Sequence, residues 1–456
     1  MLRSWKYGDK LLLTAVPQTP YHFVNSFNPT ERIYVNSFNA TERIYINSFN
    51  PTERINVFFC NLLKKIYIFA DESKRYSNMD IKRILKKQIT DRIKPQKVML
   101  IYGARRVGKT LLLKEIFNEF KGKKIILNGE SSDTVRMIAD KSISNYKRLF
   151  AGIELLAIDE AQHIPDIGMK LKLMVDEIPG LSIIATGSSS FDLQNQAGEP
   201  LVGRCTRFML TPFSIKELSE HQTSFEIITN IDHYLVYGNY PELISIESSG
   251  EQARYLTEIV DSYLLKDILA IDGIKNAQKM HDLLRLIAYQ VGSEVSIDEL
   301  GKSLGISRNT AERYLDLLQK VFVLYKLGGY SKNLRKEVTK SSKWYFQDNG
   351  IRNAILRDFR PFSERSDEER GILWENFIIS ERMKKKHNEM ANTNMYFWRT
   401  YDQQEIDLLE EDNNNLSAYE MKAGKKNPKV PKAFVNAYPN AKYDVINREN
   451  FWEYII

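Results

Sequence analysis

The sequence predicts an α/β protein whose main domain is a three-layer sandwich, with helices on both faces of a parallel sheet. Short apolar runs without polar alternation, at Val98–Tyr102, Ile125–Leu127, Leu155–Ile158 and Ile183–Ala185, are separated by helical patterns. Strands of this kind are typical of parallel sheets that are covered on both faces. A glycine-rich turn also joins the first of these strands to the helix expected at Leu111–Phe120.

The composition excludes several classes of protein. The 456 residues give room for roughly three domains. A hydrophobic content of 43% with 27% charged residues excludes a disordered or fibrous chain, and a net charge of +7 permits a nucleic-acid partner without requiring one. Cys60 and Cys205 provide neither a disulfide framework nor a cysteine-rich metal site. No apolar run is long enough to span a membrane, so we expect a cytoplasmic protein.

Changes of pattern along the chain predict four segments. Val24–Asn56 consists of three nearly identical repeats of 11 residues. This uniformity indicates a recent tandem duplication that is disordered or not translated, with Met79 as the start. The alternative is a β-prone N-terminal arm. The expected segments are a repeat-containing extension at 1–78, the α/β sandwich at 79–225, a helical domain at 226–364 and a smaller α/β domain at 365–456.

A phosphate-binding motif follows the first strand. GARRVGKT fits the pattern GxxxxGK[ST] and lies between a strand and a helix, which is the context that the pattern needs. Its backbone N–H groups and the helix N-terminus would cradle phosphates of ATP, Lys109 would reach the β- and γ-phosphates, and Thr110 would bind Mg²⁺. A chance glycine turn is the competing interpretation. The expected binding residues are Gly103, Ala104, Arg105, Arg106, Val107, Gly108, Lys109 and Thr110.

Two acids end the strand Leu155–Ile158. Asp159 would hold Mg²⁺, directly or through water, and Glu160 would be the base that polarises the attacking water. Adjacent acids after a buried strand are costly unless a positive charge lies beside them, and a metal ion supplies it. The two acids therefore strengthen the prediction of an ATP-hydrolysing site.

From Met79 onward the chain resembles bacterial and archaeal AAA+ ATPases that carry a long C-terminal domain of unknown function. The shared motifs are GARRVGKT, LLAIDEAQ, ATGSSS, LVGR followed by LTPFSIKEL, and YGNYPELI, which cover most of residues 97–245. The resemblance implies a five-stranded P-loop sheet with an extra strand between the P-loop strand and the Asp159 strand. Residues 1–78 have no counterpart in it.

The resemblance also implies two further catalytic groups. A polar residue after the strand Ile183–Ala185 would touch the γ-phosphate or the water, and either Thr186 or Ser188 fits this position. A helix cap is the alternative there. Arg204 would stabilise charge in the transition state, in its own subunit or in a neighbouring one. A surface salt bridge is the competing interpretation of this arginine.

The middle segment contains a predicted helix-turn-helix. A capping box at Ser296–Glu299 opens one helix to Leu304, and a second helix follows at Arg308–Lys320. Strands at Val321–Leu327 and Lys343–Gln347 would then flank a basic loop, as in a winged helix. This element would either contact DNA or act as a lid and packing unit. The residues expected to face DNA are Arg308, Asn309, Thr310 and Arg313, and the loop cations are Lys332, Arg335, Lys336, Lys340 and Lys343.

The C-terminal segment predicts a hairpin that carries acidic residues. With the turn centred between Asn413 and Asn414, Asp407 faces Glu420 and Glu405 faces Lys422. The four charged side chains would share one face of the hairpin. The apolar residues of the other face would be Ile406, Leu408, Tyr419 and Met421.

Two opposed carboxylates repel unless a cation lies between them, so Asp407 and Glu420 predict a divalent metal site, with Lys422 orienting water or phosphate. This arrangement resembles the PD-(D/E)xK nuclease fold, in which Glu375, in the helical segment Gly371–Arg382, matches an additional acid. An ion-paired surface hairpin is the alternative.

Together these features predict an Mg²⁺-dependent ATPase whose cycle is coupled to a winged helix and a nuclease-like domain. In one hypothesis the protein acts on DNA. In the other it is an ATP-dependent regulatory switch, and its silent nuclease-like domain binds a protein. A homo-oligomer is compatible with both hypotheses, and neither involves a membrane.

Overall fold

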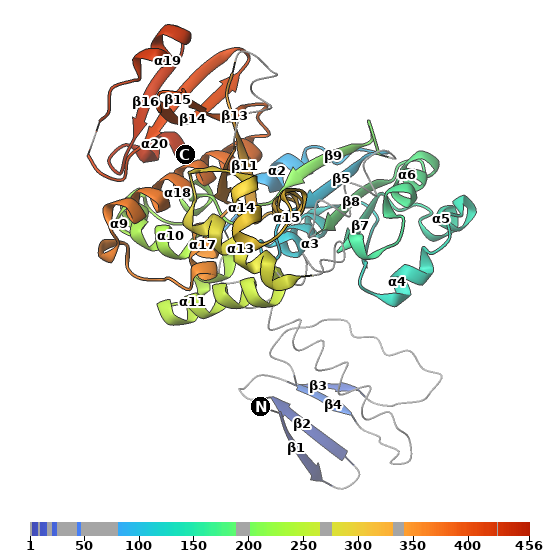
Figure 1. Ribbon diagram of the computed structural model, residues 1–456. Coiled ribbons are helices and arrows are strands. Elements are labelled where there is room, and N and C mark those ends of the chain that lie inside the picture. Colours follow the sequence, from blue (N-terminus) through green and yellow to red (C-terminus); the bar gives the residue numbers. More distant parts are fainter. Residues whose placement is uncertain are drawn as a thin grey trace. The chain divides into compact units, whose positions relative to one another are not determined.

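The computed structural model in Figure 1 describes residues 2–7, 10–15, 21–24, 43–46, 81–187, 201–264, 276–331, 342–425 and 427–456. The chain forms two compact units, Met1–Asp80 and Ile81–Ile456. In the first unit four strands form a sheet of order β1-β2-β4-β3. They are β1 (Leu2–Tyr7), β2 (Lys10–Ala15), β3 (Tyr21–Val24) and β4 (Arg43–Ile46).

The second unit begins with a parallel sheet of five strands, in the order β6-β7-β8-β5-β9. The strands are β5 (Val98–Tyr102), β6 (Lys124–Asn128), β7 (Leu155–Asp159), β8 (Ser182–Gly187) and β9 (Cys205–Met209). Strand β8 lies between the P-loop strand β5 and the Asp159 strand β7, as the resemblance implied. The expected α/β sandwich is therefore confirmed.

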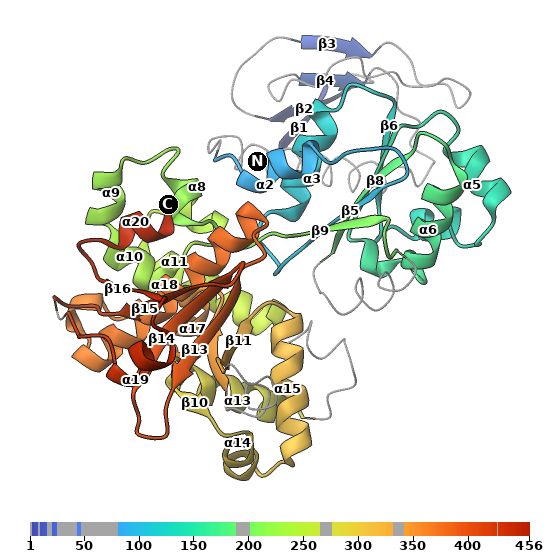
Figure 2. The same ribbon diagram turned by 90° about the horizontal axis from the view of Figure 1, so that it is seen from above.

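Helices cover both faces of this sheet (Figure 2). Alternate residues of β5 enter two different hydrophobic clusters, Met99 and Ile101 with α2 and α3, and Val98 and Leu100 with α5 and α6. This division follows from the period-two alternation of a strand. The helices of this part are α2 (Ile84–Thr90), α3 (Lys109–Glu119), α4 (Ser132–Met137), α5 (Ile143–Leu149), η1 (Ala161–His163) and α6 (Ile167–Glu177).

A helical region follows the parallel sheet. It contains α8 (Ile215–Leu218), α9 (Ser224–Thr229), α10 (Ile231–Tyr237), η2 (Pro241–Ser245), α11 (Ser249–Glu258), η3 (Ile259–Leu264), α13 (Ala277–Tyr289), α14 (Ile297–Leu304), α15 (Arg308–Lys320) and α17 (Asn349–Leu356). Helices α14 and α15 occupy the residues where the sequence predicts the helix-turn-helix. The side chains of Arg308, Asn309 and Arg313 on α15 are exposed.

The second sheet has seven strands in the order β10-β12-β11-β13-β14-β15-β16. They are β10 (Glu294–Val295), β11 (Leu324–Gly329), β12 (Ser342–Phe346), β13 (Asn394–Arg399), β14 (Glu405–Asp412), β15 (Asn415–Met421) and β16 (Lys442–Ile446). Strand β11 pairs with β13 through Gly328 and Gly329. Strands on both sides of the boundary expected near residue 365 thus belong to one sheet.

The expected basic loop is described only in part. Lys332, Arg335, Lys336 and Lys340 lie outside the described residues. Lys343 was expected to be a loop cation, but it lies in β12 and is 1% exposed. The expectation failed because Lys343–Phe346 are buried on both faces of the strand, between β10 and β11, and the sequence around Lys343 does not show this.

The long helix α18 (Asp367–Glu389) connects the helical region with the second sheet (Figure 1). Ser366 and Glu369 form a capping box at its start. It packs on β12 and β15 and also contacts α10 and α17. The short helix η4 (Phe362–Glu364) precedes α18 and contacts α10, and the last two helices are α19 (Lys432–Ala437) and α20 (Phe451–Ile455), of which α20 packs on α18.

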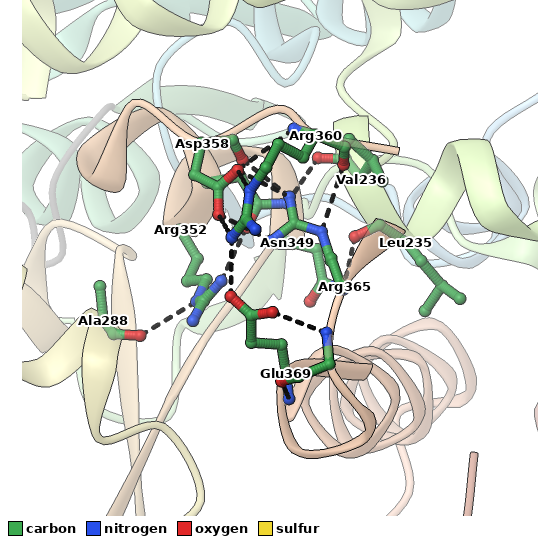
Figure 3. A network of polar contacts seen from close by, with 11 residues as sticks. Leu235, Val236, Ala288, Asn349, Arg352, Asp358, Arg360, Arg365 and Glu369 are labelled. Atoms are coloured by element: carbon green, nitrogen blue, oxygen red, sulfur yellow. Dashed lines mark hydrogen bonds and ion pairs between the residues drawn. The ribbon is translucent and has the colours of Figure 1, made fainter. Parts of the chain in front are cut away.

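A partly buried polar network fixes the segment that leads into α18 (Figure 3). The Arg365 side chain, which is fully buried, donates from Nη1 to Asp358 Oδ2 (2.9 Å), and Arg360 bonds both Asp358 and Glu369. Arg352 donates to the carbonyl of Ala288 in α13 (3.0 Å). These bonds tie α13 and α17 to the start of α18.

One glycine is required where α10 meets α17. Gly238 has φ +71°, and a Cβ at this position would lie 1.9 Å from Asp348 Oδ1. Asp348 Oδ2 in turn accepts the backbone N–H of Asn239 (2.8 Å). The motif YGNYPELI and the residue that precedes α17 are therefore joined by a hydrogen bond from a backbone N–H to a carboxylate. No helix among the described residues is long and apolar enough to cross a membrane.

Candidate functional site

The segment GARRVGKT forms the loop between β5 and α3, as the sequence predicts. Gly108 precedes α3 with φ +96°, a conformation that residues with a Cβ rarely adopt. Lys109 is 5% exposed, and its Nζ donates to the carbonyl oxygens of Gly103 (3.0 Å) and Ala104 (2.8 Å). The ammonium group is thus held within the loop at the N-terminus of α3.

Three side chains meet where β5, β7 and β8 end. Thr110 Oγ1 lies 2.8 Å from Asp159 Oδ2, and Thr186 Oγ1 lies 2.6 Å from Asp159 Oδ1. The strands are parallel, so their carboxyl ends lie at the same edge of the sheet. The structure therefore brings Thr110 and Asp159 together as expected and adds Thr186 to them.

Glu160 begins a left-handed turn, with φ +49°. Its backbone N–H donates to Thr186 Oγ1 (3.0 Å), and its carboxylate accepts a hydrogen bond from Gln162 Nε2. Ser188, the other polar residue expected after β8, lies outside the described residues. Thr186 thus connects the two acids.

Arg204 lies at the opposite edge of the sheet. Its carbonyl accepts the N–H of Val98, the first residue of β5 (2.9 Å), whereas the P-loop follows the last residue of β5. Four residues of strand separate these positions by about 13 Å. The guanidinium binds Asp176 on α6 (2.6 Å). Action on the nucleotide of its own subunit therefore does not fit this position.

The C-terminal hairpin has the predicted register. Leu408 pairs with Tyr419 and Asp412 with Asn415, so the turn centre is where the sequence placed it. The paired residues end at Leu408 and Tyr419, and Asp407 and Glu420 are the next residues on their strands. The Asp407 carboxylate also accepts the N–H of Met421 (2.7 Å).

The expected division of the hairpin faces is wrong for β14. Ile406 packs in a cluster with Leu409, whereas Leu408 packs in the large core that contains α18. The cause is a β-bulge, because β14 has one residue more than β13 between the pairs Tyr396–Leu409 and Trp398–Ile406. The extra residue turns Asp407 toward α18.

Several charged side chains gather beside this bulge. Glu375 on α18 accepts a hydrogen bond from the Tyr345 hydroxyl (2.6 Å) and lies 3.9 Å from Lys343 Nζ. Glu405 forms ion pairs with Lys343 and Arg399, and Lys422 binds Glu420 (2.6 Å). Glu405 was expected to face Lys422, but these ion pairs connect each of them to another partner.

Burial raises the pKa of the acids in this cluster. The pKa of Glu375 is raised to about 8 and that of Glu420 to about 7, and the Asp407 charge adds to both shifts. Burial likewise raises the pKa of Asp407, against the opposing effect of Lys343 and Lys422. At Lys343 burial lowers the pKa, but the surrounding carboxylates outweigh it and the net shift is upward.

Sequence reasoning missed two members of this cluster. Lys343 and Tyr345 come from β12, some thirty residues before Glu375 in the chain, and no local pattern connects them with the hairpin. Within the described residues no group of three or more His, Cys, Asp or Glu side chains is arranged to hold a metal ion.

Three family models match parts of the chain. Residues 95–219 match the AAA domain. This match supports an AAA+ nucleotide-binding ATPase. Residues 228–361 match a domain of unknown function (DUF8612), and residues 370–452 match a second one (DUF4143).

Relatives of the chain occur in bacteria and archaea. An uncharacterized protein of Mycobacterium tuberculosis is 26% identical over 328 residues, which cover 71% of this chain and 70% of the relative. An uncharacterized protein of Methanocaldococcus jannaschii is 24% identical, with coverage of 80% and 84%. A solved structure of a RuvB mutant of Thermotoga maritima is 17% identical and covers 55% of this chain and 88% of its own, with a TM-score of 0.28. This low score carries no functional information.

The raised pKa values predict how stability changes with pH. A glutamate in the unfolded chain has a pKa of about 4.3, so the folded cluster holds more protons than the unfolded chain up to about pH 8. Stability is therefore lost as the pH rises through the folded pKa. Glu420→Gln, which imitates the protonated acid, should remove part of this loss. Between about pH 6 and about pH 9, we expect the free energy of unfolding of the wild type to fall by roughly 1–2 kcal/mol more than that of the variant.

Chemical denaturation of both proteins without metal at the two pH values measures this difference. Glu411→Gln, in the neighbouring strand β14, is the control and should behave as wild type. If the free energy of unfolding fell equally in wild type and Glu420→Gln, the pKa of Glu420 would not be raised.

Proposed function

We propose that the chain binds ATP with Mg²⁺ at the loop Gly103–Thr110 and hydrolyses it. The observation that carries this proposal is the set of hydrogen bonds among Thr110, Asp159 and Thr186 beside Lys109. The N-terminus of α3 and the ends of β7 and β8 hold these groups in place, so little rearrangement is needed when the phosphates enter. Lys109 would exchange its two carbonyl partners for phosphate oxygens.

The residues present fit a magnesium ion. Mg²⁺ prefers oxygen ligands and usually retains several waters, and Thr110 and Asp159 already place their oxygens 2.8 Å apart. These two residues would hold the ion. When bound, Mg²⁺ would neutralise charge on the β- and γ-phosphates.

Glu160 is the proposed general base. It follows Asp159 directly, and its hydrogen bond with Gln162 holds the carboxylate beside the end of β7. Thr186 fits the role of the polar residue near the γ-phosphate, for which Ser188 was the other candidate. Arg204 would act only on the nucleotide of a neighbouring subunit, after release from Asp176.

A helix offers a route by which the ATPase cycle would reach the C-terminal half. Glu381 on α18 accepts the N–H of Ile215 (2.8 Å) and the side-chain amide of Asn239 (3.2 Å). Lys384 donates to Glu381 (2.7 Å) and to the carbonyl of Phe213 (3.1 Å). The segment that follows β9 is therefore bonded to α18 through buried polar groups.

The same helix carries Glu375 into the C-terminal cluster. The pKa values of Glu375 and Glu420 are raised in part by the charge of Asp407, so ionised carboxylates repel one another in this cluster. A divalent cation between Asp407 and Glu420 would offset this repulsion. The crowded carboxylates thus support binding of such a cation, in a domain with nuclease-like fold. When bound, the ion would activate water for attack on a phosphodiester.

Two functions are compatible with an ATPase that is coupled to this C-terminal half. In the first, the helix-turn-helix α14–α15 contacts DNA as a winged helix, and the C-terminal cluster acts on that DNA. The exposed arginines of α15 favour this interpretation. In the second, the C-terminal half is a silent domain that binds a protein under nucleotide control. A DNA affinity that falls steeply with salt would distinguish the first from the second.

Glu160→Gln should retain ATP but hydrolyse it at least about a hundredfold more slowly, because the amide cannot accept the proton of the attacking water. Phosphate release and binding of ATP are measured on the same preparation. Glu154→Gln is the matched control. Glu154 lies immediately before the first residue of β7, at the opposite end from Glu160, so the variant should hydrolyse ATP as the wild type does. Hydrolysis by Glu160→Gln at the wild-type rate would remove Glu160 from the mechanism.

Asp407→Ala and Glu420→Ala should each abolish Mn²⁺ binding by the nucleotide-free full-length chain and leave ATP hydrolysis intact. The full chain is needed because β11 and β12 belong to the same sheet as β14 and β15. Asp412→Ala, near the exposed tip of the same hairpin, is the control. Calorimetry that detects no Mn²⁺ binding by the wild type would overturn the metal site and favour the regulatory-switch hypothesis.

A further inference from the structure

Arg83 lies behind the P-loop, outside every motif that the sequence shows. It precedes α2 and is 8% exposed. Its Nη2 donates to the carbonyl of Val107, and its Nη1 bonds Glu217 Oε2 (3.3 Å). The guanidinium carbon lies 3.9 Å from the centre of the Phe213 ring. All these contacts hold a charged group against the outer side of the loop.

The contact with Val107 constrains a peptide group of the P-loop. The C=O and N–H of a trans peptide point in opposite directions. Because the Val107 carbonyl points to Arg83, the N–H of Gly108 in the same peptide points away from it. A Cβ on Gly108 would have Arg83 Nη2 as its nearest neighbour, at 3.8 Å. Arg83 therefore supports the peptide that immediately precedes α3 from its carbonyl side.

We propose that Arg83 is a positioning residue for the nucleotide, because it fixes the Val107–Gly108 peptide so that the Gly108 N–H faces the phosphates. This inference rests on the proposed binding of ATP at the loop. Arg83 itself would make no contact with the nucleotide, since it lies on the outer side of the loop.

Glu217 holds the guanidinium in place. It is 1% exposed and forms a capping box with Ser214 at the start of α8. Its Oε1 accepts the N–H of Ile84 (3.2 Å), and its Oε2 accepts the N–H of Ser214 (2.9 Å). Two backbone donors thus hold the Glu217 carboxylate in place independently of its ion pair with Arg83. A rigid acceptor of this kind orients the arginine better than a mobile surface acid would.

The test replaces Arg83 with methionine, which keeps packing against Phe213 but has no donor. Binding of ADP with Mg²⁺ is measured by calorimetry, and folding is checked by circular dichroism at the same temperature. We expect the Kd for ADP to rise roughly tenfold or more, the effect of a lost hydrogen bond to a charged group. Because ADP and the transition state use the same N–H, KM should rise while kcat changes less.

Arg352→Met is the matched control. Arg352 is 4% exposed and also donates to a backbone carbonyl, that of Ala288, but it lies away from the P-loop. We expect this variant to lose stability and to bind ADP as the wild type does. An equal weakening of ADP binding in both variants would reduce Arg83 to a structural residue.

Arg83→Lys keeps the charge and one donor centre, without the planar fork that reaches Val107 and Glu217 together. Its Kd should lie between those of wild type and Arg83→Met, at least roughly threefold above wild type. Wild-type affinity in folded Arg83→Met would overturn the inference. If Arg83→Met does not fold, wild-type affinity in Arg83→Lys overturns it instead. Failure of the wild type to bind ADP would refute the proposed function itself.

Discussion

The arrangement of the second unit depends on two paired buried charges in α18, Glu381 and Lys384, which also bond the segment that follows β9. Glu381 is fully buried and Lys384 is 3% exposed. Besides each other, their partners are backbone groups of Phe213 and Ile215 and the side chain of Asn239. A buried charge that loses its partners costs several kcal/mol, so the helix cannot leave this segment without a large penalty. This constraint connects the end of the parallel sheet to the start of the second half.

The same helix then organises the second sheet. The Asn376 side chain bonds both the N–H and the carbonyl of Phe346 in β12 (2.8 and 3.1 Å), and Ser380 donates to the carbonyl of Gln347 (2.7 Å). Glu375, one position earlier, reaches the cluster around Asp407. A displacement of α18 by the ATPase half would therefore move one acid of the C-terminal cluster relative to the strands.

The sequence was informative wherever a local pattern determines geometry. The apolar runs predicted the parallel strands, GARRVGKT predicted the loop before α3, and the centre of the hairpin turn predicted the pairing of Leu408 with Tyr419. Contacts between distant segments were not predictable in this way. Lys343 enters the cluster because β11 pairs with β13, and the bulge that turns Asp407 depends on the partner strand. No spacing in one chain reveals either of these pairings.

The central claim is that nucleotide at the P-loop and the position of α18 are linked. Hydrogen exchange of the full-length Glu160→Gln chain, with and without ATP and Mg²⁺, tests it most directly. The account predicts slower exchange in residues 103–113 on binding, together with a change in Asp367–Glu389. Lys109→Ala, added to the same chain, should remove both changes. Protection of the P-loop with no change in α18 would contradict the link between the two halves.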